Sequence, residues 1–391
     1  MIISYLFIYS LINMYWIKVP YLHSKSENFI YKAKIAAFDI DGTIITTKSK
    51  KKFPVNKNDW KLLYGEQTLE KLKELHVNDY CIIFISNQGG LKSDIQINDW
   101  IEKIQNVVAE IQKYENINIP ISIYAATADY LYRKPLPKLW NIILDNLKDV
   151  NLKINKLSFY CGDAAGRKND HNDTDYKFAV NCNLEFKIPE MLFLNQEVDP
   201  NDKLTITYPD LSLIPFSQKI NLNKKYLFNP ISEDKNELIL MIGFPGSGKT
   251  YFAKTFIEPN GYIYISQDQL KTKAKCIKEL KTNLELNKNI VIDNLNYSKA
   301  IRQEYISIAK QYNYEIRCIV LNTSKELSKH NMMCRFYTSN GVISRIPELV
   351  FNNYNKKYEV PEMNENIHKI EFIDYSKIAD IKSKTYYDYY Y

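Results

Sequence analysis

Two aspartates separated by one residue are the first group in the sequence that could carry chemistry. Asp39 and Asp41 lie in the segment DIDGT, at the end of the apolar run from Ile35 to Ile40. Such a run predicts a buried strand, and open α/β sheets bind ligands beyond the carboxyl ends of their strands. Two carboxylates at this spacing can serve as a covalent nucleophile and a general acid. We therefore expect Asp39 to attack a substrate and Asp41 to protonate its leaving group.

Polar residues also follow three further apolar runs, which predict three more strands. The runs with the residues after them are Tyr80 to Ile85 with Ser86, Ile121 to Ala125 with Arg133 and Lys134, and Leu157 to Cys161 with Gly162 and Asp163. Helix-like segments separate them, at Gly65 to Leu75, Asn98 to Tyr114 and Leu136 to Leu147. This alternation predicts a doubly wound α/β domain, in which the four strand ends lie at one edge. A turn that merely favours Asp and Gly is the weaker interpretation of DIDGT.

The second candidate site is the octapeptide GFPGSGKT, which fits GxxxxGK[ST] at every position. Backbone N–H groups of such a loop surround phosphate oxygens, the lysine reaches the outer phosphates, and the last hydroxyl can ligate Mg²⁺. The residues expected to contact ATP are Gly243, Gly246, Ser247, Gly248, Lys249 and Thr250, with Thr250 also a metal ligand. A glycine turn without a ligand is the weaker alternative. The motif predicts an ATP-binding P-loop.

The P-loop lies in a second region of alternating strands and helices. The predicted strands are Glu237 to Ile242, Tyr262 to Ile265, Ile290 to Ile292 and Ile316 to Leu321, with helices at Thr250 to Phe256 and Ser298 to Tyr312. Asp268 follows the second strand and is a candidate base for an acceptor hydroxyl, although an aspartate there could instead cap a helix. Asp293 and Asn294 could support the metal or the acceptor, or form a turn.

Two arginines late in the second region could act as a lid over bound phosphates. Arg335 and Arg345 lie in a polar segment, and a planar guanidinium matches the geometry of phosphate oxygens. Placement on the surface without a role is an equally good interpretation of either residue. We include both in the predicted ATP site.

Length and composition agree with two folded α/β domains. The chain has 391 residues, of which 45% are apolar and 25% charged, a balance that excludes a largely disordered or fibrous protein. The net charge of +7 is compatible with a polyanionic partner without proving one. The predicted organisation is an extension at 1–34, a first domain at 35–200, a proline-rich linker at 201–235, a second domain at 236–381 and a low-complexity tail at 382–391.

The sequence favours a reducing compartment and no membrane anchor. Its six cysteines form no CxxC pair. Residues 1–17 are apolar, but no basic residue precedes Lys18 and no small-residue cleavage site follows. A signal peptide needs both features, so an accessory strand or helix is the better interpretation.

The ordered strand ends of the first region resemble those of the haloacid dehalogenase superfamily of phosphatases. Its four motifs correspond to DIDGT, the region of Ser86, Lys134 and the segment GDAAGR. The resemblance implies that Ser86 and Lys134 bind the transferring phosphoryl group. It also implies that Asp39, the main-chain carbonyl of Asp41 and Asp163 hold Mg²⁺. A further acidic ligand is expected among Asp170, Asp173 and Asp175, and we prefer Asp175 because the segment after it resembles the start of the family's last helix.

A phosphatase followed by a P-loop kinase resembles the eukaryotic polynucleotide kinase 3′-phosphatases. The matching segments are FDIDGTIITTKSKKKFP, SNQGG, YRKP, GDAAGR, GFPGSGKT and IDNLN. The resemblance implies removal of 3′-phosphates and ATP-dependent phosphorylation of 5′-hydroxyls at DNA breaks, by a monomer in the nucleus. Only about 38 residues precede Asp39, too few for the family's forkhead-associated domain. The resemblance therefore leaves open whether repair scaffold proteins recruit this chain.

One departure from the family lies beside the predicted kinase base, where Asn-Arg is replaced by Ser266 and Gln267. Loss of that arginine could weaken binding of the acceptor or of phosphate. Two other substrate classes stay open, RNA ends and a small phosphorylated metabolite. A scaffold that binds DNA ends without catalysis is a third alternative, but the chemical residues of both motifs are present.

Overall fold

The computed structural model describes residues 14–18, 20–127, 130–197, 228–231, 234–374 and 389–391. The chain divides into two compact units, Met1–Thr207 with Tyr389–Tyr391, and Tyr208–Asp388. Residues 1–13 of the predicted extension, most of the predicted linker 201–235 and residues 382–388 of the predicted tail lie outside the described residues.

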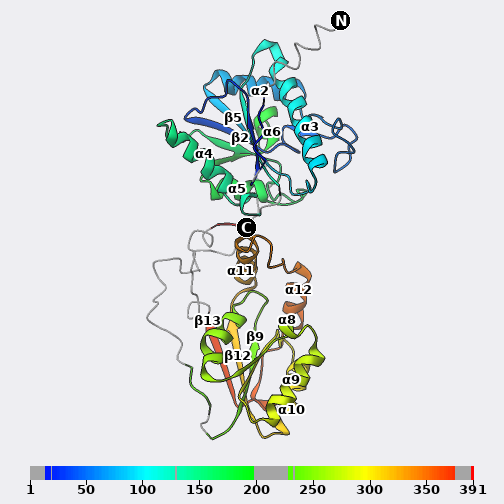
Figure 1. Ribbon diagram of the computed structural model, residues 1–391, viewed down its shortest axis with the longest axis vertical. Coiled ribbons are helices and arrows are strands. Elements are labelled where there is room, and N and C mark those ends of the chain that lie inside the picture. Colours follow the sequence, from blue (N-terminus) through cyan, green and yellow to red (C-terminus); the bar gives the residue numbers. More distant parts are fainter. Residues whose placement is uncertain (1–13, 19, 128–129, 198–227, 232–233, 375–388) are drawn as a thin grey trace. The chain divides into compact units, whose positions relative to one another are not determined.

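The first unit is built on a six-stranded sheet with the order β1-β6-β5-β2-β7-β8 (Figure 1). Its strands are β1 Leu22–Lys25, β2 Lys34–Phe38, β5 Tyr80–Asn87, β6 Ile121–Ala126, β7 Phe159–Cys161 and β8 Glu185–Lys187. Only β1 runs antiparallel, against β6, and the others pair in parallel. Phe38, the last residue of β2, lies opposite Phe84 of β5 and Cys161 of β7. The carboxyl ends of the central strands therefore lie together.

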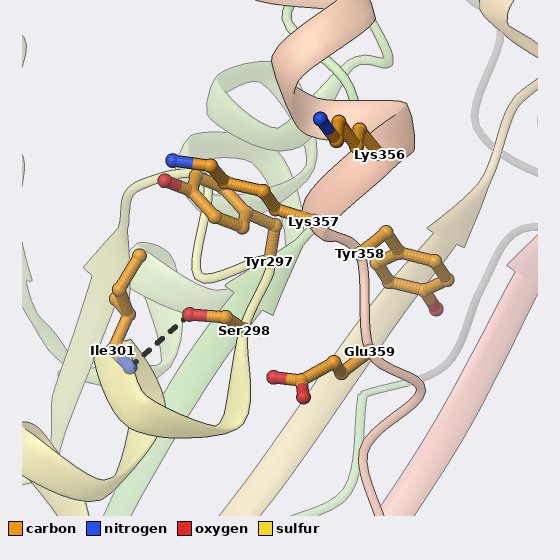
Figure 2. A pocket seen from close by; sticks show the side chains of 7 residues that line it. All are labelled: Tyr297, Ser298, Ile301, Lys356, Lys357, Tyr358 and Glu359. Carbon is orange, nitrogen blue, oxygen red and sulfur yellow. Dashed lines mark hydrogen bonds between the residues drawn. The ribbon is translucent and has the colours of Figure 1, made fainter.

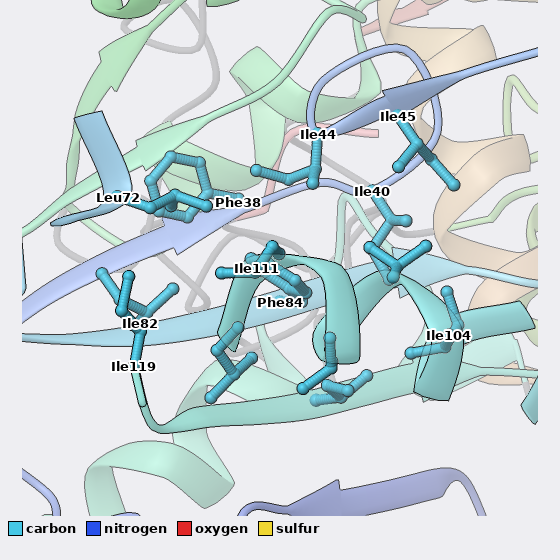
Figure 3. Packing of buried hydrophobic residues seen from close by; sticks show 14 of the residues in the cluster. Phe38, Ile40, Ile44, Ile45, Leu72, Ile82, Phe84, Ile104, Ile111 and Ile119 are labelled. Carbon is cyan, nitrogen blue, oxygen red and sulfur yellow. The ribbon is translucent and has the colours of Figure 1, made fainter. Parts of the chain in front are cut away.

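Helices cover both faces of this sheet because its strands are apolar on both sides. One face carries α2 Glu66–Val77, α3 Asp94–Lys113 and α6 Pro189–Leu194, and the other carries α4 Lys138–Asp149 and α5 Thr174–Asn181. Figure 3 shows Ile104 and Ile111 of α3 packed in one cluster with Phe84 of the sheet and Ile40 of the loop after β2. The smaller elements are β3 Ile45–Thr46 paired with β4 Lys61–Leu62, η1 Tyr114–Asn116 and η2 Tyr130–Tyr132.

The second unit is a five-stranded parallel sheet with the order β10-β11-β9-β12-β13. Its strands are β9 Glu237–Ile242, β10 Ile263–Ile265, β11 Ile290–Asp293, β12 Glu315–Asn322 and β13 Lys369–Asp374. Its helices are α7 Lys249–Phe252 continuing as η3 Ala253–Ile257, η4 Glu258–Asn260, α8 Gln267–Leu270, α9 Lys273–Glu285, α10 Lys299–Lys310, α11 Lys325–Thr338, α12 Glu348–Lys357 and η5 Met363–Glu365. Helices α9 and α10 pack on one face, and α7 with η3 on the other.

The prediction of two α/β units with parallel central sheets is confirmed. Sequence analysis missed the edge strands β1, β8 and β13 of the two large sheets, and the two short strands β3 and β4, which pair only with each other. Their sequences, such as Glu-Phe-Lys for β8, carry polar residues in place of a continuous apolar run. An edge strand is paired on one side only and can expose such residues, so it lacks the signal of a buried strand.

Two of the six arginines, Arg302 and Arg317, form buried ion pairs that stabilise the fold. Arg302 pairs with Glu365, with nitrogen to oxygen distances of 2.7 and 2.8 Å. Arg317 of β12 lies 2.5 Å from Glu237 of β9. All four side chains are almost fully buried. A buried charge is tolerated when it is paired in this way, so both arginines hold elements of the fold together.

Residues near both ends of the chain belong to the first unit. The last three residues, which we left without structure, group with this unit, and the Asn181 side chain hydrogen bonds to the backbone N–H and C=O of Tyr390, each at 2.8 Å. Near the amino end, Trp16 packs edge-on against Trp100. None of the helices in the described ranges is both long and apolar enough to cross a bilayer.

Candidate active sites

Asp39 is positioned by the end of the central strand β2. Its backbone N–H donates to the carbonyl of Cys161 in the neighbouring strand at 2.9 Å, which extends the pairing of the two strands by one residue. The side chain is only 11% exposed. Burial, opposed by the neighbouring Lys134 and assisted by the carboxylates of Asp175 and Asp163, raises the pKa of Asp39 to about 8. The predicted nucleophile therefore depends on positive charge nearby to stay ionised.

Lys134 supplies positive charge at the centre of this site. Its ammonium donates to Asp39 Oδ1, Asp175 Oδ1 and the Tyr160 hydroxyl, each at 2.7 Å. Burial acts to lower the pKa of Lys134, but the two carboxylates raise it overall. Tyr160 in turn donates to Asp175 Oδ1 at 3.1 Å. Sequence analysis missed Tyr160, because it lies inside an apolar strand where an aromatic residue usually signals only the core.

Asn87 holds the backbone of Lys134 in place. Its side-chain amide donates to the Lys134 carbonyl and accepts from the Lys134 N–H, both at 2.9 Å. Because Asn87 ends β5 and Lys134 follows β6, this double hydrogen bond joins two strand ends. The fixed backbone positions the Lys134 side chain, whose ammonium contacts Asp39 and Asp175.

Three carboxylates, those of Asp39, Asp163 and Asp175, place oxygens within 4.8 Å of one another. Burial, with a further contribution from Asp175, raises the pKa of Asp163 to about 6. Ionised, the three outweigh the single charge of Lys134, and hard oxygen ligands with excess negative charge suit Mg²⁺. The residues present therefore fit a divalent cation.

The structure separates the three aspartates that sequence analysis left open. Asp175 lies in the carboxylate cluster, and its Oδ2 accepts from the N–H of Ala164 at 3.1 Å. Asp170 instead pairs with Arg167 at 2.9 Å, and Asp173 with Lys177 at 2.9 Å. The preference for Asp175 agrees with this geometry, since helix α5 turns its side chain toward Lys134.

Asp41 lies at the rim of the site, with its side chain 48% exposed. Its Oδ1 is 3.1 Å from the Lys103 ammonium, and its Oδ2 accepts from Gln88 Nε2 at 2.8 Å. Gln88 also donates to Ser86 Oγ at 2.9 Å, so a single amide connects two of the predicted site residues. Ser86 itself is buried. Lys103 had no signal in the sequence, because it lies within a helix far from any motif.

The P-loop of the second unit connects β9 to α7. Three of its glycines have positive φ, 154° at Gly243, 80° at Gly246 and 99° at Gly248, a region that other residues rarely adopt. A Cβ at Gly246 would lie 2.2 Å from the carbonyl oxygen of Ser328 in α11. The loop is also held by Asn331, which donates to the Gly246 carbonyl at 3.0 Å. The glycines therefore permit both the turn and a close approach to α11.

Lys249 is buried within this loop. Its ammonium donates to the carbonyls of Gly243 at 2.8 Å and Phe244 at 2.7 Å. Burial lowers the pKa of Lys249 to about 8, while Asp293 and Asp268 oppose the shift and Arg335 adds to it. These electrostatic interactions bring both acidic residues and Arg335 into the neighbourhood of the lysine.

Asp293, at the end of β11, joins the P-loop to the neighbouring strand. Its Oδ2 accepts from Thr250 Oγ1 and from the Tyr264 hydroxyl, both at 2.6 Å. P-loop enzymes hold Mg²⁺ with a hydroxyl and a carboxylate arranged in this way. The structure thus places Asp293 in the site rather than in a simple turn. Tyr264, on β10, is a second residue that sequence analysis did not single out.

Asp268 lies in the first turn of the short helix α8, with an exposed side chain. The helix is capped by Ser266, whose hydroxyl accepts from the Asp268 N–H at 3.2 Å. The Asp268 carboxylate is therefore not needed as the cap, which was the alternative interpretation. Asn294 accepts from the N–H of Gln267 at 2.9 Å and so ties this helix to the end of β11.

The two predicted lid arginines have different surroundings. Arg335 lies on α11 and acts electrostatically on Lys249. Arg345 lies over the rings of Phe336, 4.3 Å from its centroid, and Tyr337, to whose hydroxyl it donates at 3.3 Å. These contacts attach Arg345 to aromatic residues of α11, and its predicted role at the phosphates stays a prediction.

A pocket of about 460 Å³ lies on the second unit between the start of α10 and the end of α12 (Figure 2). It is lined by Tyr297, Ser298, Ile301, Lys356, Lys357, Tyr358 and Glu359. Aromatic contacts lead from it to the P-loop, because Tyr354 lies 5.8 Å from the ring of Tyr297 and 4.3 Å from that of Phe244. The pocket combines basic and aromatic groups close to the predicted ATP site.

Together, the two units define an enzyme that joins a phosphatase to a P-loop kinase. Residues 34–193 match the family of polynucleotide kinase 3 phosphatases, and residues 238–361 match an AAA domain. A bifunctional polynucleotide phosphatase/kinase of Schizosaccharomyces pombe is 35% identical, over 89% of this chain and 81% of its own. A protein of Acanthamoeba polyphaga mimivirus assigned the same two activities is 34% identical, over 90% of this chain and 88% of its own.

A polynucleotide 3′-phosphatase of Saccharomyces mikatae is 30% identical, over 41% of this chain and 84% of its own. The two longer relatives match across both units. The chain therefore belongs to the family of bifunctional polynucleotide phosphatase/kinases, and it is an enzyme of that class.

Proposed function

We propose that this enzyme repairs the ends of broken DNA strands. Its first domain, residues 35–200, would remove a 3′-phosphate, and its second domain, residues 236–381, would phosphorylate a 5′-hydroxyl with ATP. The observation that carries the proposal is the contact of Lys134 with both Asp39 and Asp175, each at 2.7 Å, in a chain that also has a complete P-loop. Both products are the ends that a ligase joins.

Asp39 acts as the nucleophile in the first half of phosphatase turnover. One carboxylate oxygen attacks phosphorus, the bond from phosphorus to O3′ breaks, and Asp41 gives its proton to the leaving oxygen. Lys134 and Ser86 bind the oxygens of the transferring group. This step leaves an aspartyl-phosphate on Asp39 and a strand with a free 3′-hydroxyl.

Water resolves this intermediate in the second half of turnover. Asp41, now a carboxylate, accepts a proton from the attacking water, and the bond between phosphorus and the Asp39 oxygen breaks. Inorganic phosphate leaves, and both aspartates return to their starting states. Asp41 therefore acts as acid and then as base, which agrees with its exposed position at the rim of the site.

Asp39 and Asp163, with the Asp41 main-chain carbonyl and Asp175, would hold Mg²⁺ in the phosphatase domain. The cation would neutralise charge as a phosphate dianion approaches the carboxylates. The oxygens of the three carboxylates lie within 4.8 Å of one another, which supports a shared ion. Thr250, together with Asp293, would hold Mg²⁺ in the kinase domain.

In the kinase domain, Asp268 would accept the proton of the 5′-hydroxyl. The oxygen then attacks the γ-phosphorus of ATP, and the bond to ADP breaks. The P-loop residues Gly243, Gly246, Ser247 and Gly248 would contact the phosphates through their N–H groups. Lys249, Arg335 and Arg345 would stabilise the charge of the transferring group.

The pocket beside α12 is our proposed contact for the acceptor strand. Lys356 and Lys357 can bind backbone phosphates, while Tyr297 and Tyr358 can stack on bases. Replacing both lysines by alanine should raise KM for a 5′-hydroxyl oligonucleotide and leave KM for ATP unchanged. Equal KM values for the oligonucleotide in both proteins would place the acceptor elsewhere.

A substrate panel tests the proposed function. DNA oligonucleotides with a 3′-phosphate or a 5′-hydroxyl, matching RNA oligonucleotides and small sugar phosphates are incubated with Mg²⁺ and ATP. We expect both DNA ends to be processed. Faster turnover of the RNA ends would change the substrate class, and turnover of sugar phosphates alone would overturn the proposal.

A tagged protein should enter the nucleus if it repairs chromosomal DNA.

A further inference from the structure

Helix α3 contains a lysine where its sequence pattern calls for an apolar residue. Trp100, Ile104 and Val107 are buried at helical spacing, and Lys103 lies on the same face with only 5% exposure. Ile104, the next residue, belongs to the same buried cluster as Ile40 (Figure 3). Burying an ammonium costs free energy unless it is paired. The structure must therefore supply a partner for Lys103.

Asp41 is that partner, at 3.1 Å from the Lys103 ammonium. Within the described part of the chain, it is the only hydrogen-bond or ion-pair partner of Lys103. The other carboxylate oxygen of Asp41 accepts from Gln88 at 2.8 Å. Each oxygen of Asp41 therefore has its own donor, and the two donors come from different elements, α3 and the loop after β5.

Stability does not explain this arrangement. The Asp41 side chain is 48% exposed, so solvent screens its attraction to Lys103. A well-packed apolar residue in place of a buried charged one is often neutral or stabilising. Direct contact with a polynucleotide does not explain it either, because the Lys103 side chain is only 6% exposed.

We propose that Lys103 is a positioning residue for the general acid Asp41, and that Gln88 assists it. This inference rests on the proposed phosphatase function. Together the two donors would fix the rotation of the carboxyl group, so that its proton meets O3′ as the phosphorus–oxygen bond breaks. The proton moves from Asp41 to O3′, and Lys103 gives up none. Its ammonium also stabilises the carboxylate that this transfer leaves behind.

A comparison of leaving groups tests this role in the full-length enzyme with Mg²⁺. The alkoxide at O3′ needs protonation as it leaves, whereas the nitrophenolate of p-nitrophenyl phosphate does not. The value of kcat/KM covers steps up to cleavage of that bond. We therefore measure kcat/KM for a 3′-phosphate oligonucleotide and for p-nitrophenyl phosphate, in wild type, Lys103→Met, Lys103→Arg and Asp41→Asn.

For Lys103→Met we expect a decrease of about 10–100-fold on the oligonucleotide, and at most about 3-fold on the aryl phosphate. Lys103→Arg should recover most of the loss. Asp41→Asn should also lose more kcat/KM on the oligonucleotide than on the aryl phosphate, and its decrease on the oligonucleotide should be larger than that of Lys103→Met. Unchanged kcat/KM in Lys103→Met, or an equal decrease on both substrates, would overturn the positioning role. An Asp41→Asn enzyme without selectivity would instead overturn the proposed function of Asp41.

If Lys103→Met does not fold, as judged by its melting curve, Gln88→Met decides the question from the other side of the carboxylate. Its side chain is only partly buried, so folding is not at risk. Its kcat/KM should also decrease more on the oligonucleotide than on p-nitrophenyl phosphate, but by less than in Lys103→Met. A Gln88→Met enzyme that loses equal activity on both substrates, or none, would contradict the proposal.

Discussion

The Lys134 ammonium lies 2.7 Å from the Asp39 carboxylate, and this buried pair joins the ends of two strands that are far apart in the sequence. Burial works against both charges, raising the pKa of Asp39 and acting to lower that of Lys134. Each charge therefore depends on the other and on the neighbouring carboxylates. The same dependence makes the phosphatase site sensitive to single substitutions, whereas the P-loop has its own set of partners.

The two activities should be separable by single substitutions. Asp39→Ala removes the proposed nucleophile, so phosphatase activity should fall at least about 10³-fold, as seen when covalent nucleophiles are removed. Lys249→Ala removes a buried ammonium from the P-loop, and kinase activity should fall about 10²–10³-fold. Phosphate release from a 3′-phosphate and transfer of labelled phosphate to a 5′-hydroxyl are measured on the same preparations. Loss of both activities in one folded variant would contradict two independent sites.

Phosphatase activity should depend on a divalent cation held by the carboxylate cluster. A chelator should abolish it, and added Mg²⁺ should restore it. Asp163→Asn removes one negative ligand, so half-maximal activity should need at least about 10-fold more Mg²⁺. Asp170→Asn is the matched control, because Asp170 pairs with Arg167 outside the cluster. An equal shift in both variants would argue against Asp163 as a ligand.

The P-loop should not tolerate a methyl group at Gly246. A Cβ there would lie 2.2 Å from the Ser328 carbonyl oxygen, so Gly246→Ala must displace the loop. Displacements of about 1 Å can cost about 10²-fold in rate, and we expect kinase activity to fall by that amount. Phosphatase activity on a 3′-phosphate should not change.

Gly261 provides the control for backbone strain at Gly246. Its φ is 84°, close to the 80° of Gly246, but a Cβ at Gly261 would have no atom within 4 Å. Gly261→Ala should therefore carry similar strain and keep kinase activity within about 3-fold. If the two variants lose equal activity, strain rather than the approach to α11 would be the cause.

The first unit should lose stability in mild acid because of His23. This ring stacks on Tyr124, with centroids 4.2 Å apart, and burial followed by repulsion from Lys25 lowers its pKa to about 4. The unfolded chain has a pKa near 6.5 and binds the proton first. The stability associated with neutral His23 is therefore complete above about pH 6.5 and is lost as the pH falls toward 4.

The size of this effect is limited because His23 is partly exposed. We expect less than about 2 kcal/mol in the free energy of unfolding. Melting temperatures of wild type and His23→Gln are measured from pH 7.5 to pH 4.5, with the exposed His171→Gln as control. The wild-type advantage over His23→Gln should shrink on acidification. A constant difference across this range would show that His23 does not titrate as stated.

The central strands and both motifs could be predicted from the sequence because their signals are local. A buried parallel strand needs a continuous apolar run, and the DIDGT and GFPGSGKT segments follow such runs directly. The glycines of the P-loop and the carboxylates at Asp39 and Asp41 belong to the same few residues. Edge strands such as β8 were missed because their polar residues carry no such signal.

Only the tertiary structure decided which distant residues complete each site. Asp170, Asp173 and Asp175 all stayed candidates in the sequence, and in the structure helix α5 brings the Asp175 carboxylate to Lys134. Tyr160, Tyr264 and Lys103 look like core or helix residues in the sequence, and packing of separate elements brings them to Lys134, Asp293 and Asp41. Spacing within a motif is set by the chain, whereas contacts between elements are set by how their apolar faces pack.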